Sequence, residues 1–222
     1  MDALPGDIFC SAPRFSGAGG EQALSEAIIE ACQDDPYPTP SHTFVAVDAG
    51  TIVEATWPEV KTTPLTFYTQ GNWKLWQMRW QSLGDAQRLA IAQAALSKVG
   101  QPYGVIGLEW DGLDRLFHTR AVSQALGFDK ILVCSGLAAW ASKEGAGRGV
   151  RDDQTGNLLR PESVTPDDFV DAARKWPADL QPVWDNLTAD DYAAAEATWE
   201  KKLAYARQAA QIATAGWPTP GT

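Results

Sequence analysis

The thiol of Cys134 lies at the sequence position best suited to nucleophilic chemistry. An apolar, strand-like run (residues 131–133) ends at this cysteine, and a helix-like run (residues 135–142) begins directly after it. The unpaired backbone N–H groups and the positive end of the dipole at a helix N-terminus lower the pKa of a thiol. The same N–H groups can bind the oxyanion that forms when a thiolate attacks a carbonyl group. We therefore predict that Cys134 is a nucleophile.

A cysteine nucleophile requires a base, and the chain contains only two histidines, His42 and His118. His42 begins an apolar run (residues 43–47) that predicts a strand, and a strand would hold the imidazole in a fixed position. His118 lies in a predicted short helix within a long connection. We favour His42 as the base and keep His118 as the alternative.

A predicted hairpin supplies the acid that would orient this base. Residues 48–50 are typical of a turn, and residues 51–55 form the returning strand. Pairing about this turn brings Glu54 near the level of His42, with both side chains on one face of the sheet. A carboxylate there can accept a hydrogen bond from the imidazole and stabilise its charged form. Asp48 is an alternative acid, but its position is more typical of a turn residue.

The two other cysteines do not indicate a metal or redox site. Cys10 lies in a strand-like run and Cys32 in a helix-like run, and no two of the three cysteines have the C-x-x-C spacing. Unreactive cysteines pack as small hydrophobic residues, and we expect this of both. We expect neither a metal ion nor an organic cofactor.

Length and charge limit the class of protein. A chain of 222 residues can form one domain with a sizeable core, and its net charge of −10 argues against binding to nucleic acid or to an anionic membrane. No apolar run approaches the length of a membrane span. The first residues lack the basic and apolar regions of a secretory signal peptide, so we expect a cytoplasmic or phage virion-associated protein.

The hydrophobic periodicity predicts an α+β fold. We expect strands at residues 6–11, 43–47, 51–55 and 75–80, and helices at residues 21–32, 85–99, 135–142 and 166–175. Residues 33–41, 104–130 and 145–160 are predicted to be mainly irregular. Trp73, Trp76 and Trp80 form a local group, which we interpret as core and sheet packing, with a platform for carbohydrate or peptide as the alternative.

We expect the chain to divide into a catalytic domain (residues 1–175) and a C-terminal helical tail (residues 176–222). Thr188 followed by an acid at the third helical position, Asp191, is typical of a capped helix start, and an alanine-rich helix would run to about residue 213. Trp199 and Leu203 lie on its apolar face. Because such a helix is only marginally stable alone, we expect it to dock on the domain, on a second copy of the chain or on a virion partner.

Five short motifs occur in a characteristic order along the chain. They are Gly6-Asp7, Ser41-His42, Glu54-Ala55, Pro102-Tyr103 and Cys134-Ser135. A G-x-P-Y element followed by C-S-G-L resembles NlpC-type cell-wall endopeptidases of the papain-like superfamily. Because the G-D and S-H motifs precede the cysteine, the chain resembles the circularly permuted branch, which includes the YiiX-like and lecithin-retinol-acyltransferase-like proteins. The resemblance covers roughly residues 5–172.

This resemblance implies a permuted papain-like fold, in which helices pack against an antiparallel sheet. It implies that Cys134 is the nucleophile, His42 the base and Glu54 the orienting acid. Tyr103 and Ser135 would lie at the oxyanion or substrate-binding side of the site. The sequence departs from the family pattern in the long span between Tyr103 and the cysteine, and in Val133, where the families have Asp or Tyr.

The expected activity is thiol-dependent hydrolysis of an amide bond. Peptidoglycan stem peptide is the substrate that the resemblance implies, and a lipid, another amide or a thioester is the alternative substrate for a hydrolase or acyltransferase. A different class of function also fits the sequence, namely a non-catalytic structural module of a phage virion or tail that keeps the fold.

Overall fold

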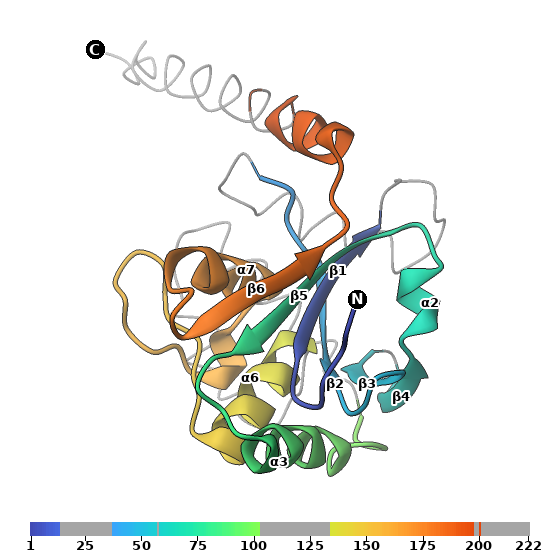
Figure 1. The fold of residues 1–222 in the computed structure, drawn as a ribbon, viewed down its shortest axis with the longest axis vertical. Coiled ribbons are helices and arrows are strands. Elements are labelled where there is room, and N and C mark those ends of the chain that lie inside the picture. Colours follow the sequence, from blue (N-terminus) through green and yellow to red (C-terminus); the bar gives the residue numbers. More distant parts are fainter. Residues whose placement is uncertain (14–36, 57, 103–133, 198–199, 201–222) are drawn as a thin grey trace, which may run out of the picture. The chain divides into compact units, whose positions relative to one another are not determined.

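The computed structural model describes residues 1–13, 37–56, 58–102, 134–197 and 200 of the chain. The chain divides into two compact units, residues 1–33 with 39–186 and residues 34–38 with 187–222, and each is described by itself. The first unit is an α+β structure built on one sheet (Figure 1).

Within the described residues, the sheet has six antiparallel strands in the order β4-β3-β2-β1-β5-β6. The predicted hairpin is confirmed as β2 and β3, while β4 and β6 were not predicted. The strands span Ile8–Pro13 (β1), His42–Ala46 (β2), Thr51–Ala55 (β3), Val60–Pro64 (β4), Trp73–Trp80 (β5) and Leu180–Asp185 (β6).

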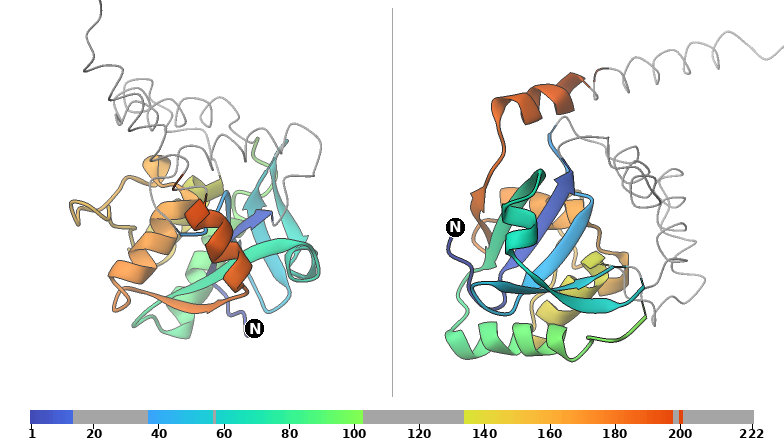
Figure 2. Two further views of the ribbon diagram at one scale, coloured as in Figure 1. Left: turned by 90° about the horizontal axis from the view of Figure 1, so that it is seen from above. Right: turned by 90° about the vertical axis from the view of Figure 1, so that its right-hand side faces the viewer.

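Four helices and one 3-10 turn accompany the sheet in the described part of the first unit. α3 and α6 pack against each other, α6 contacts β2 and β3, and α7 contacts β1, β5 and β6 (Figure 2). The helices span Thr66–Thr69 (α2), Asp85–Leu96 (α3), Cys134–Ala146 (α6) and Pro166–Lys175 (α7), and the 3-10 turn η1 spans Pro161–Ser163.

Alternation along the strands gives the sheet two different faces. On the face towards α6 and α7, Trp80 donates from its indole nitrogen to Ser142 Oγ at 2.9 Å, and the Cys10 thiol lies 3.5 Å from the carbonyl oxygen of Pro166. The other face carries a separate apolar cluster that includes residues of the α2 segment. Its buried members are Ala3, Phe9, Phe44, Ala46, Ile52, Leu65, Tyr68 and Leu75.

The three neighbouring tryptophans do not share one surface. Trp76 and Trp80 are buried on the helix-covered face, whereas Trp73 has the opposite parity in β5 and packs beside Tyr68 at a ring-centroid distance of 5.1 Å. The core-packing interpretation therefore holds for Trp76 and Trp80. A single platform made of all three rings is excluded by the alternation of the strand.

The contact between α3 and α6 depends on small residues. A Cβ atom at Gly145 would lie 2.4 Å from the backbone nitrogen of Ile91, so any larger residue would separate the helices. Ala92 and Ala95 of α3 are also buried. This close packing holds α6 along its length and therefore positions its first residue, Cys134.

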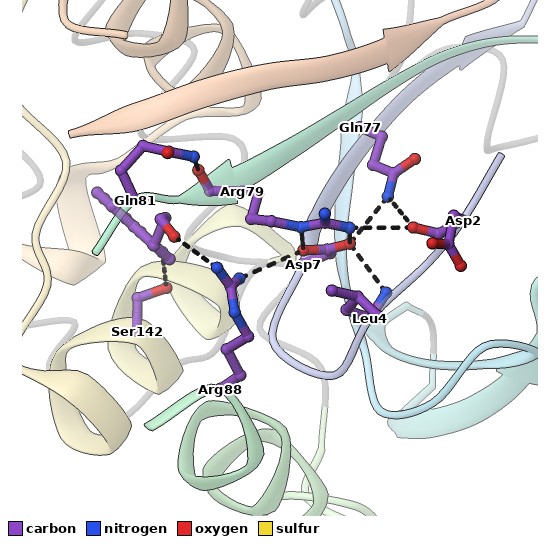
Figure 3. Close-up of polar contacts among 9 residues, drawn as sticks. Asp2, Leu4, Asp7, Gln77, Arg79, Gln81, Arg88 and Ser142 are labelled. Carbon is purple, nitrogen blue, oxygen red and sulfur yellow. Dashed lines mark hydrogen bonds and ion pairs between the residues drawn. The ribbon is translucent and has the colours of Figure 1, made fainter. Parts of the chain in front are cut away.

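A buried ionic network ties the N-terminus to the sheet (Figure 3). The Asp7 carboxylate is fully buried and accepts two hydrogen bonds from Arg79, each 2.7 Å long, and one from Gln77 at 2.8 Å. The preceding Gly6 has φ of +79°, and a Cβ there would lie 2.7 Å from the carbonyl oxygen of Arg88. The Gly-Asp motif therefore has a structural role here, since it anchors β1 to β5 and α3.

The sheet extends beyond the boundary expected for the catalytic domain. Strand β6 lies within residues 176–222, the segment assigned to the tail, yet it pairs with β5 and buries Leu180. Asn186 continues this junction, because its side chain accepts from the backbone N–H of Leu75 at 2.8 Å and donates to the carbonyl of Trp73 at 3.0 Å. The first unit therefore continues to residue 186, and the C-terminal part of the second unit begins at residue 187.

In the second unit, residues 189–197 are helical. The predicted cap is confirmed, because the backbone N–H and the hydroxyl of Thr188 both donate to the carboxylate of Asp191 at 2.9 Å. Trp199 and Leu203, the expected contact residues of the tail, lie outside the described residues.

Candidate active site

Cys134 is the first residue of α6, and its side chain is buried. The helix is held at this end by the Ser135 hydroxyl, which donates to the carbonyl oxygen of Val164 at 2.5 Å, and by the buried apolar residues Leu137 and Ala138. The backbone N–H groups of Ser135 and Thr43 both hydrogen-bond the Cys134 sulfur. The predicted position of the thiol at a helix N-terminus is therefore confirmed.

The Thr43 contact lies just beyond the end of the β2–β3 ladder. Strand β3 pairs with residues 44–46 of β2, so its ladder stops one residue short of Thr43. The Thr43 backbone N–H is thus available to the sulfur of Cys134 on the side of β2 that faces β3. The end of the hairpin and the start of α6 meet at this point.

His42 begins β2 and lies between the thiol and a carboxylate. Its Nε2 atom is 2.8 Å from Glu54 Oε2, and its ring also forms a side-chain hydrogen bond with Cys134. Because Nε2 is occupied by Glu54, Nδ1 is the ring nitrogen that remains for the sulfur. The side chain of His42 is 16% exposed and that of Glu54 is 4% exposed, so the imidazole is the accessible member of this pair.

Glu54 accepts two further hydrogen bonds that the sequence did not predict. The Tyr68 hydroxyl donates to Oε2 at 2.6 Å, and the Thr63 hydroxyl donates to Oε1 at 2.5 Å. Tyr68 comes from α2 and Thr63 from β4. Both elements lie beyond the hairpin that carries His42 and Glu54, so no local spacing of donor and acceptor signals either contact.

The site favours a charged pair of thiolate and imidazolium. Burial disfavours the imidazolium, but the charge of Cys134 and hydrogen bonds to Cys134 and Glu54 outweigh it and raise the pKa of His42 to about 10. Burial likewise disfavours the thiolate, yet the charge and hydrogen bond of His42 and two backbone N–H groups lower the pKa of Cys134. Each charge thus stabilises the other.

Glu54 is held as an anion in spite of its position in the core. Burial would raise the pKa of its carboxyl group, but hydrogen bonds from His42, Thr63 and Tyr68 and the charge of the imidazole lower it to about 2. A carboxylate with this pKa does not take the proton from His42 at neutral pH. It orients the ring and stabilises its positive charge.

Cys10 provides an internal contrast to Cys134. It is also buried and outside any disulfide, and its sulfur lies 3.4 Å from the Thr43 hydroxyl. Burial raises the pKa of the Cys10 thiol, and the nearby charges of Cys134 and Asp167 act in the same direction. Its environment therefore holds Cys10 as a neutral thiol.

The other candidates from the sequence have different outcomes. The Ser135 hydroxyl is directed at Val164, so only the backbone N–H of Ser135 faces the sulfur, where it can contribute to an oxyanion site. Asp48 accepts from the backbone N–H of Gly50 at 2.8 Å, as a turn residue does. Tyr103, His118 and Cys32 lie outside the described residues.

Two other kinds of site are absent from the part of the chain that the structure describes. It contains no group of three or more His, Cys, Asp or Glu side chains arranged to hold a metal ion. None of the helices within the described ranges is both long and apolar enough to cross a membrane.

Comparisons with known proteins do not place the chain in a family. No protein-family model matches the sequence, and no curated protein is detectably similar to it. The site itself combines the Cys134 thiol with its lowered pKa, the His42 imidazole, the Glu54 carboxylate and a helix N-terminus in one cluster.

Proposed function

We propose that the protein is a cysteine hydrolase that cleaves an amide bond through Cys134, His42 and Glu54. The observation that carries this proposal is the continuous contact from the Cys134 thiol through the His42 imidazole to the Glu54 carboxylate, at the head of a helix. Nucleophile, base and orienting group in mutual contact are the arrangement that covalent acyl transfer requires.

The proposed reaction has two halves. The Cys134 sulfur attacks the carbonyl carbon and forms a C–S bond, while the carbonyl oxygen becomes an oxyanion near the backbone N–H groups that begin α6. Collapse of this intermediate breaks the C–N bond, and His42 gives its proton to the leaving amine. Water then attacks the thioester, His42 accepts the proton of that water, and the acid product leaves with the thiolate restored.

Peptidoglycan stem peptide is the proposed substrate, and this step rests on the resemblance to the permuted NlpC-like branch of the papain-like fold. The antiparallel sheet packed against helices is compatible with that fold. Four of the five motifs support it further, because Asp7, His42, Glu54 and Cys134 all have defined contacts in the first unit.

The test compares the purified chain with Cys134→Ser and Cys10→Ser on purified peptidoglycan and on soluble stem peptides, with products identified by mass spectrometry. Loss of amide cleavage in Cys134→Ser and its retention in Cys10→Ser are expected. A panel of acyl esters and thioesters is run in parallel, so that cleavage of these alone would reassign the substrate. If the wild-type chain cleaves none of them and its Cys134 is alkylated no faster than Cys10, the hydrolase proposal is wrong and the structural module is the better interpretation.

A further inference from the structure

The carboxylate of Glu54 is hydrogen-bonded by side chains from three different elements. Three donors converge on its two oxygens, with His42 and Tyr68 on Oε2 and Thr63 on Oε1. A carboxylate that accepts several hydrogen bonds is held both in its ionised form and in one orientation. The two hydroxyl donors are therefore placed to fix the orientation of the carboxylate that His42 contacts through Nε2.

Tyr68 also contacts the imidazole and the apolar cluster directly. Its ring lies 6.2 Å from the His42 ring at an interplanar angle of 26°, and 4.4 Å from the Phe44 ring at the same angle. The tyrosine is buried, so its hydroxyl is fixed by the packing of its ring. The Tyr68 side chain thus holds the carboxylate of Glu54 and also lies beside the ring of His42.

We propose that Tyr68 and Thr63 are positioning residues of the site, which hold Glu54 as an oriented anion against His42 and so maintain the thiolate of Cys134. This inference rests on the proposed function for its consequence in catalysis. Both hydroxyls donate to the carboxylate of Glu54, so each acts on the thiol through Glu54 and His42. Removal of either hydroxyl frees the carboxylate of Glu54 to turn away from Nε2. The imidazolium of His42 is then less stabilised, and so is the thiolate of Cys134.

The test is a double-mutant cycle that needs no substrate. The pKa of Cys134 is measured from the pH dependence of its iodoacetamide alkylation, with peptide mapping by mass spectrometry. Tyr68→Phe and Thr63→Val are compared in the wild-type and Glu54→Gln backgrounds. Phe keeps the packed ring and removes only the hydroxyl, and Val is nearly the same shape as Thr.

In the wild-type background, each variant is expected to raise the pKa of Cys134 by about one pH unit, the effect of losing one hydrogen bond to a charged group. In the Glu54→Gln background the same changes are expected to alter the thiolate–thiol equilibrium by less than about twofold, because the effect passes through Glu54. Thr62→Val, at an exposed position on the opposite face of the same strand, and Tyr192→Phe, in the second unit, are the matched controls.

Two outcomes overturn the proposal. One is an unchanged Cys134 pKa in both Tyr68→Phe and Thr63→Val. The other is an equal change in the two backgrounds, which would give the hydroxyls a general structural role. If the Tyr68→Phe variant does not fold, the Thr63→Val variant alone tests the proposal. Coupling without any hydrolysis would contradict the proposed function and leave the positioning role intact, whereas hydrolysis without coupling would contradict the positioning role only.

Discussion

His42 and Glu54 are hydrogen-bonded at 2.8 Å although they are not opposite each other in the β2–β3 ladder. The residue paired with Glu54 is Phe44, so the imidazole reaches the carboxylate along the diagonal of the hairpin. Diagonal neighbours on one face remain within reach of long side chains. The offset is useful, because it places His42 at the end of the ladder, where its other nitrogen can meet Cys134 from α6.

The first prediction concerns the dependence of the thiol on His42. In His42→Gln the positive charge and its hydrogen bond are lost while the burial of the thiol remains, so the pKa of Cys134 is expected to rise above that of an ordinary thiol. The rate of Cys134 alkylation at pH 7 should fall on the order of a hundredfold, towards that of Cys10. His118→Gln is the control. Equal alkylation of Cys134 in wild type and His42→Gln would contradict the ion pair.

The second prediction concerns acid stability. The pKa of Glu54 in the folded protein is about 2, below its ordinary value of 4.5, so its contribution to stability is fully present above pH 4.5 and is lost as the pH falls towards 2. At pH 6, Glu54→Gln should lower the free energy of unfolding by about 2 kcal/mol. Urea unfolding at pH 6, 4 and 3 should show this difference shrinking. A difference that stays constant with pH would be inconsistent with a folded-state pKa near 2.

The third prediction concerns the anchor of the N-terminus. Asp7→Asn leaves the partly buried guanidinium of Arg79 without its charged partner. Removing one partner of a buried ion pair is strongly destabilising. We expect a loss on the order of 3 kcal/mol in the free energy of unfolding, measured by urea denaturation. Asp171→Asn disrupts the partly exposed pair with Arg174 and should change stability by less than about 1 kcal/mol. Equal effects of the two changes would mean that the Asp7 network does not hold β1.

The fourth prediction separates the edge strand from the tail. A chain that ends at residue 177 lacks β6, which leaves β5 as an exposed edge and removes the buried Leu180, so it should unfold at a markedly lower temperature. A chain that ends at Asn186 keeps all six strands and should retain the thermal stability of the first unit and the fast alkylation of Cys134. If the longer chain loses only self-association or partner binding, the tail helix is assigned to that contact. If both truncations are equally stable, β6 is not part of the folded sheet.

The local pattern of the sequence determined the central part of the candidate site. Apolar runs with β-branched residues on both sides of Asp48-Ala49-Gly50 specify a hairpin, and a hairpin has a calculable register. The proximity of His42 and Glu54 on one face of the sheet could therefore be predicted from the sequence alone. Likewise, the change from an apolar run to a helical run indicated that Cys134 begins a helix.

Tertiary structure alone decided the rest, because those contacts join segments whose spacing carries no periodic signal. Tyr68 and Thr63 reach Glu54 only after β4 pairs with β3 and after α2 packs on the aromatic cluster. Strand β6 is recognisable only through its pairing with β5, since its own residues are mostly exposed. Trp73 lies on one face of β5, and Trp76 and Trp80 lie on the other. Each face is covered by residues distant in the chain. Sequence therefore specified the three side chains of the candidate site, while long-range packing specified the hydrogen-bond donors that hold Glu54.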